Sequence, residues 1–257
     1  MAWSRMSGWS TAREGRHVAE ASNAKALGRF AGLAYLAVIV FSAPGYMILT
    51  GLLAGSPQIE LARLAANPAQ FILALAASTI GFAAWTVLGV LLYRLMSAAG
   101  QIAGLLMLIL AVGGTAANLF ALSQLLPLIG SPGMDASTLA PIVQGYQRTL
   151  LLAQVFSGIW LFPFGWLVLR SRVAPRIFAF ALFAGGVFYS MVFATAFDPG
   201  LEHTAAYRII SPITGVFGEA VGELGICLWL LIKGARQAET RPARAPPRGV
   251  FGSPAGA

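Results

Sequence analysis

Two glutamates near the end of the chain carry the strongest chemical signal. Glu219 and Glu223 lie in the apolar segment SPITGVFGEAVGELGICLWLLIKGA, residues 211–235. They are four residues apart, so a helix places both side chains on one face. At about 1.5 Å per residue, the carboxyls lie roughly 12 and 18 Å below the start of the segment, near the centre of a bilayer. A pair of acids at that depth could handle a proton, an ion or a ligand.

The energetic cost of a buried carboxylate makes these two residues worth testing. A charge at the bilayer centre costs at least about 2.5–3.5 kcal/mol on insertion scales. The nearest basic residues in sequence, Arg208 and Lys233, lie at the two ends of the segment. We therefore expect at least one carboxyl to be protonated at neutral pH and the two to titrate as a coupled pair. The alternative is a protonated acid that only hydrogen-bonds a neighbouring helix.

Polar residues in other apolar segments fall at a similar depth. They are Ser78, Thr79, Asn118, Gln154, Ser157, Tyr189, Ser190 and Thr195. The candidate site for a proton, ion or ligand comprises Glu223, Glu219, Ser78, Asn118, Gln154, Ser157 and Ser190. The alternative is that these side chains only join helices, with each hydrogen bond worth about 0.6–2 kcal/mol.

A line of glycines runs beside the two glutamates. Gly215, Gly218, Gly222 and Gly225 are spaced by three, four and three residues, which keeps them on one stripe of a helix. Gly218 and Gly222 form a small-xxx-small motif, which lets a neighbouring backbone approach closely. We expect this stripe to be a helix-packing surface inside the bundle.

The elements that must position these residues are membrane spans. Hydrophobic residues make up 58% of the chain and charged residues 10%, with a mean hydropathy of +0.75. A soluble domain carries roughly 25% charged residues, so the composition predicts a multi-pass membrane protein. Six segments are long enough to cross a bilayer as helices: Phe30–Leu53, Phe71–Met96, Ile102–Leu126, Thr149–Leu169, Ile177–Phe197 and Ser211–Ile232. The predicted fold class is all-α, a polytopic bundle of six transmembrane helices.

The distribution of basic residues predicts the orientation. Fourteen of the 17 Lys and Arg residues fall on one side of the six spans and three on the other. The positive-inside rule then places both termini in the cytoplasm. We expect residues 1–29 to form a basic cytoplasmic segment, 30–235 the transmembrane domain, and 236–257 a disordered, basic, Pro-rich tail. The net charge of +8 therefore indicates orientation and contact with anionic lipid headgroups at cytoplasmic loops, not a nucleic-acid partner.

Several classes of chemistry have no support in the residues. The single cysteine, Cys227, excludes an internal disulfide and a cysteine-pair metal site. The two histidines, His17 and His203, lie outside the apolar segments. The chain contains no GxSxG, HExxH or P-loop motif. We expect no metal, no cofactor and no enzymatic activity.

Three blocks of residues resemble one family. They are GWLVLRSRVAPRIFAFALFAGGVFYS (165–190), GELGICLWLLIKGA (222–235) and RFAGLAYLAVIVF (29–41). Together they are similar to the bacterial multi-pass membrane group called domain of unknown function 4386, over about residues 28–236. The resemblance implies a six- or seven-span bundle of the bacterial plasma (inner) membrane without an established activity. It favours Glu223, which matches the family's Gly-Glu position, over Glu219. The family's glycine after its Pro-Arg block is Ala179 here.

Three functions compete at this point. The first is a non-catalytic structural or partner-binding bundle, with a homo-oligomer or another membrane protein as its partner. The second is a small proton- or ion-coupled transporter that uses the carboxylates of the sixth helix. The third is an intramembrane enzyme or cofactor binder. A water-sized path to Glu223 would favour transport, whereas a dry, close-packed surround would favour the structural role.

Overall fold

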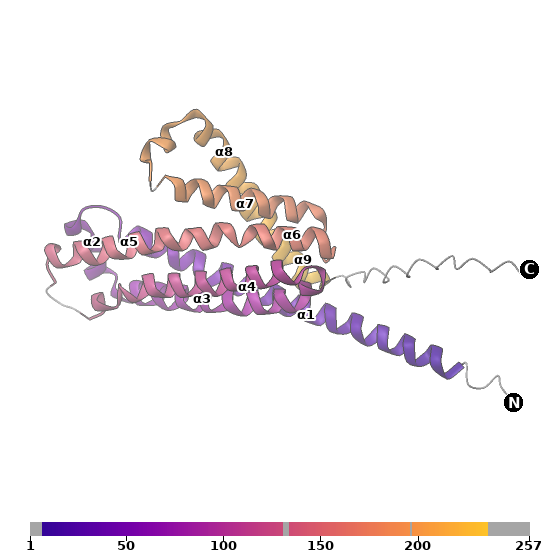
Figure 1. Cartoon of the computed structure of the whole chain (residues 1–257). Coiled ribbons are helices and arrows are strands. Elements are labelled where there is room, and N and C mark those ends of the chain that lie inside the picture. The colour runs from indigo at the N-terminus through magenta and orange to yellow at the C-terminus, as the bar shows by residue number, and fades with distance from the viewer. Residues whose placement is uncertain (1–6, 131–133, 196, 236–257) are drawn as a thin grey trace, which may run out of the picture.

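The chain folds into a bundle of six membrane-crossing helices. The computed structural model describes residues 7–130, 134–195 and 197–235, and among them it contains helices and no strand. Six helices are long and apolar enough to cross a membrane, which confirms the all-α, six-span prediction. Both described ends lie at one end of the bundle (Figure 1), here named the terminal end. The opposite end is named the far end.

The spans are built from the following elements. The first three spans and their connections comprise α1 (Ser7–Leu52), α2 (Pro57–Ala66), α3 (Pro68–Met96), η1 (Ser97–Ala99), α4 (Gln101–Ser123) and η2 (Leu126–Leu128). The last three comprise α5 (Ala136–Ile159), α6 (Leu161–Ser171), α7 (Arg176–Ala194), η3 (Pro199–His203), α8 (Ala205–Val216), η4 (Phe217–Leu224) and α9 (Gly225–Lys233). The element η4 is a π-helix, and the other three η elements are short 3₁₀-helices.

The fourth span begins further upstream than the sequence predicts. The sequence places its start at Thr149, whereas α5 already begins at Ala136. Asp135 caps this extension, because its carboxylate accepts a hydrogen bond from the backbone N–H of Thr138. Hydrogen bonds from Thr138 and Ser137 hold the pKa of Asp135 below its usual value. The cap stabilises an amphipathic stretch that hydropathy alone reads as a loop.

The six spans form a closed ring. The helix α1 packs against α3 and α9, α3 against α4, and α4 against α5 and α6. The ring continues from α5 and α6 to α7, and from α7 to α8 and η4. It closes at the terminal end, where Gly28 and Gly32 of α1 lie directly against the backbone of Ala235 and Leu231. In Figure 1, α8 bends away from the rest of the bundle at the far end.

The interior of the ring divides into two buried clusters. One includes Tyr35, Trp160 and Phe164 and extends toward the terminal end, whereas the other includes Leu49 and Leu125 and lies toward the far end. Large apolar side chains are exposed on all six spans. These outward side chains are where the bundle would contact lipid tails, because soluble proteins rarely expose apolar surface of this extent.

The glycine stripe of the last span packs against α7. A Cβ added at Gly218 would overlap the backbone of Gly185, and one added at Gly222 would lie 2.9 Å from the carbonyl carbon of Ala181. Gly215 and Gly225 lie against Phe188 and Phe178 of the same helix. The absence of side chains along this stripe therefore brings the two backbones into direct contact.

This contact generates a stability prediction. Gly218→Ala should lower the free energy of unfolding by about 1–3 kcal/mol, because the added methyl group overpacks the contact with Gly185. The control is Gly51→Ala, since Gly51 is helical and has no neighbour within 4 Å of an added Cβ. Thermal unfolding in detergent should show a lower Tm for Gly218→Ala and an unchanged or higher Tm for Gly51→Ala. Equal Tm values for the two variants would contradict the packing role.

Candidate functional site

A cavity lies in the middle of the ring. Its volume is about 510 Å³, within the range of small-molecule sites. All six spans contribute to its wall. Its polar lining residues are Ser42 and Tyr46 of α1, Asn118 of α4, Gln154 and Ser157 of α5, Tyr189 of α7, and Glu219 and Glu223 of η4. The cavity therefore gathers polar groups that are far apart in sequence.

The two glutamates occupy different levels of this cavity, and each has a tyrosine partner. Tyr35 of α1 donates its hydroxyl hydrogen to Oε2 of Glu223 at 3.1 Å. Tyr189 of α7 lies within hydrogen-bonding range of the Glu219 carboxyl. Glu223 is half-buried and nearer the terminal end, whereas Glu219 is exposed at the rim. Among the described residues of the lining, none is Lys, Arg or His, so no base neutralises either acid.

The glutamates are carried by an unusual helical segment. The π-helix Phe217–Leu224 contains both of them and both glycines that contact α7 most closely. A π-helix is rare and often marks a functional site, because its i→i+5 hydrogen bonds change which residues share a face. Here the glycine stripe of η4 lies against α7, while the carboxyls on the adjoining face line the cavity.

Aromatic rings close the cavity toward the terminal end. Trp85 and Trp160 form part of its wall, with ring centroids 5.4 Å apart in an edge-to-face arrangement. Trp160 also stacks on Phe164 at 5.2 Å and contacts Tyr35 at 6.3 Å. The side chains of Phe164 and Tyr35 are fully buried. The indole nitrogen of Trp85 is buried and has no hydrogen-bond partner among the described residues.

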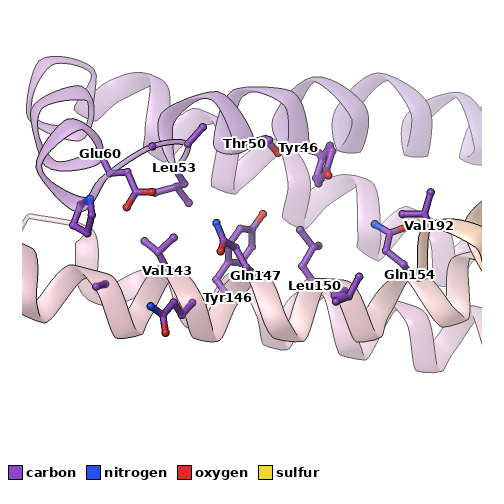
Figure 2. Close-up of a pocket in the computed structure, with 16 residues that line it drawn as sticks. Tyr46, Thr50, Leu53, Glu60, Val143, Tyr146, Gln147, Leu150, Gln154 and Val192 are labelled. Carbon is purple, nitrogen blue, oxygen red and sulfur yellow. The ribbon is translucent and has the colours of Figure 1, made fainter. Parts of the chain in front are cut away.

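A second cavity adjoins the first at the far end. Its volume is about 520 Å³, and Figure 2 shows Tyr46 and Thr50 of α1 across from Gln147 of α5. Tyr46, Leu150, Gln154 and Val192 line both cavities, so the two meet at these residues. We name this second cavity the vestibule.

The vestibule holds a third carboxyl. Glu60 of α2 lines it and is 4% exposed. Burial raises the pKa of Glu60, and the nearby Arg63 partly offsets this effect. The guanidinium of Arg63 donates to the carbonyl oxygens of Gly51 and Ala54, so it also ties α2 to the end of α1. Glu60 therefore gives the far end of the hollow an acidic group.

The structure brings together five of the seven residues that the sequence proposes for the site. Glu219, Glu223, Asn118, Gln154 and Ser157 line the central cavity. Ser78 and Ser190 do not. Ser78 is buried between α3 and α1, where it contacts Gly45. Ser190 donates to the carbonyl oxygen of Gly186 one turn earlier, at 2.7 Å.

Sequence reasoning omits several residues of this site. The residues that it does not mention are Tyr35, Ser42, Tyr46, Trp85 and Trp160, whereas Tyr189, which it places at the depth of the glutamates, does line the cavity. A tyrosine within the first span, such as Tyr35, is the signal that could have been used, because its hydroxyl needs a polar partner inside the membrane. Within the described residues, no three His, Cys, Asp or Glu side chains come together as metal ligands.

The fold and the cavity define a polytopic helical membrane protein with an internal, acid-lined hollow. The sequence model of the family described as a domain of unknown function (DUF4386) matches residues 30–234, so the chain belongs to that family. The match confirms the resemblance carried by the three sequence blocks. No curated protein and no solved structure matches the chain.

The connection between the two cavities can be tested by chemical labelling. In a Cys227→Ala background, Gln154→Cys should react quickly with a water-soluble maleimide in detergent micelles, because Gln154 lines both cavities. Ser78→Cys is the control, since Ser78 is 1% exposed and lies between helices. Labelling rates are measured by the mass shift of the intact protein. A Gln154→Cys rate as slow as that of Ser78→Cys would show that water does not reach the cavity.

Proposed function

We propose that the protein is a small proton- or ion-coupled transporter that uses the carboxyls of Glu223 and Glu219. The observation that carries the proposal is the central cavity, which all six spans line and which holds both acids. It leads to the vestibule at the far end and ends at Trp85, Trp160 and the buried rings behind them. A hollow that extends to one end of the bundle and stops at packed rings supports a carrier that opens on one side at a time.

The proposed coupling rests on the two tyrosine–glutamate pairs. A carboxyl without a basic neighbour is stable as the protonated acid, and it can release its proton when a solute occupies the cavity. The Tyr35 hydroxyl donates to Glu223 and so stabilises the carboxylate after the proton has left. When the solute leaves, the carboxylate regains a proton. This exchange changes no covalent bond of the solute, so the proposal requires no enzymatic activity.

The competing proposal is a non-catalytic structural or partner-binding bundle. Close packing of η4 on α7 supports it, because that surface holds the last two spans together. The cavity beside Glu223 favours transport, since a purely structural bundle gains stability by filling such a space. The two proposals differ in the effect that they predict for Glu223→Gln, which replaces the acid by a neutral amide. Transport requires the acid, whereas a structural role does not.

Transport can be tested in proteoliposomes loaded with a pH-sensitive dye. Quaternary ammonium compounds, amino acids, sugars, Na⁺ and K⁺ are added outside in turn, and the lumenal pH is recorded. Wild-type protein should give a pH change with at least one solute, and Glu223→Gln should abolish it because no exchangeable proton remains. The control is Glu202→Gln, since Glu202 is exposed on η3 and lies outside both cavities.

Two results would contradict the transport proposal. One is a wild-type protein that gives no pH change with any solute. The other is a Glu223→Gln variant that behaves as the wild type does, which is the outcome that the structural proposal predicts.

We further propose that the terminal end faces the cytoplasm of a bacterium and that the vestibule faces outward. The basic turn around Arg170, Arg172 and Arg176 would then contact anionic headgroups of the plasma membrane. The apolar outer faces of the spans would then lie within the membrane, where they could contact lipid, a second copy of the chain or another membrane protein.

Orientation can be checked by labelling intact cells with an impermeant maleimide in the Cys227→Ala background. Glu202→Cys at the far end should react, because its position would face outward. Gln101→Cys at the terminal end should react only after the cells are lysed, and both positions are exposed in the structure. The reverse pattern would overturn the proposed orientation.

A further inference from the structure

From its charge and its walls, we infer that the central cavity binds an organic cation, with the positive group beside Glu219 and Glu223. The inference rests on the proposed function, because it names the class of solute that the transporter would carry. It depends on three features of the cavity: its acidic side chains, its aromatic wall and its lack of enough oxygen ligands for a metal ion.

The charge of the cavity selects against anions. Two carboxyls line it, a third lies in the adjoining vestibule, and no Lys, Arg or His is among the described lining residues of the central cavity. In a space of low dielectric constant, such a lining attracts cations and repels anions. A bound cation would also remove the cost of an unpaired carboxylate at Glu223.

The rings of the wall favour an organic cation. Six aromatic side chains from four spans line the cavity: Tyr46, Phe82, Trp85, Trp160, Phe188 and Tyr189. Ammonium groups are attracted to the faces of such rings within about 6 Å of the centroid, most strongly when both are shielded from water. The buried indole N–H of Trp85, which lacks a partner, adds a donor for an oxygen atom of the ligand.

The same site is a poor one for a bare metal ion. Calcium takes 6–8 oxygen ligands, and magnesium takes an octahedral set. The described residues contain no group of three acidic, His or Cys side chains that could begin such a set. A cavity of about 510 Å³ is also much larger than an ion requires. The size and the aromatic wall are instead those of a small-molecule site.

Binding can be measured by calorimetry on the purified full-length protein in detergent. The probes are tetraethylammonium and a matched pair of opposite charge, tetraphenylphosphonium and tetraphenylborate. We expect saturable binding of both cations and none of tetraphenylborate, although the two tetraphenyl ions have the same shape. The inference would be overturned if the two tetraphenyl ions bound with equal affinity, or if neither of them bound.

Variants locate the binding site. Glu219→Gln should weaken cation binding at least tenfold. An unchanged Tm for this variant would show that the loss of affinity does not come from loss of folding. Glu223→Gln should do the same, while Glu202→Gln should retain the wild-type affinity. Tyr189→Phe keeps the ring and should bind severalfold more tightly than Tyr189→Leu. Wild-type affinity in Glu219→Gln and Glu223→Gln together would overturn the placement.

The natural cation could be a free solute or the ammonium group of a lipid, and reconstitution distinguishes them. In nanodiscs, a free-solute site should bind tetraethylammonium equally in phosphatidylglycerol and in phosphatidylethanolamine. A headgroup site should bind it more weakly in phosphatidylethanolamine, because that lipid competes. Proton-coupled transport of a sugar or amino acid without cation binding would refute this inference and leave the proposed function intact. A cavity closed to maleimide would refute both.

Discussion

The free-energy cost of a carboxyl in hydrocarbon is the constraint on which this structure depends. Glu219 and Glu223 have no basic residue among their described cavity neighbours, so they must be satisfied by hydroxyl groups and by the cavity itself. Tyr35 and Tyr189 come from two different spans, α1 and α7. The acids therefore tie the first, fifth and sixth spans around one space, and the remaining spans complete its wall.

The π-helix η4 reconciles two demands on the same eight residues. Gly218 and Gly222 let one face approach α7 until the backbones touch, which no larger residue permits. The adjoining face then keeps its carboxyls toward the cavity. A helix held firmly along one stripe can present acidic groups on the adjoining face without losing its position, and this is why dense packing and a cavity occur side by side here.

The sequence predicts the spans well and the site only in part. Hydropathy is a local property, so six apolar stretches identify six helices. In the same way, the spacing of the four glycines is enough to place these glycines on one stripe of the last helix. The start of α5 at Ala136 escapes hydropathy, because a polar cap at Asp135 and tertiary contacts support that turn. Depth alone groups Ser78 and Ser190 with the glutamates, but rotation about the helix axis separates them, since Ser78 faces Gly45 and Ser190 bonds its own helix. Tyr35 pairs with a residue 188 positions away, and only the ring of helices brings them together.

The length of the fourth span, in which α6 follows α5 directly after Trp160, has a further consequence for how a solute would lose its water. Ala136–Ser171 is 36 residues long, which corresponds to roughly 54 Å of helix against about 30 Å of hydrocarbon. If its Ser171 end lies at one membrane surface, its Ala136 end would extend well beyond the hydrocarbon at the other, and most of the vestibule would then lie at the level of the headgroups. A solute would exchange part of its hydration shell there for Glu60 and the glutamines of α5. It would shed the rest only among the rings beside Glu223, so dehydration would proceed in two smaller steps.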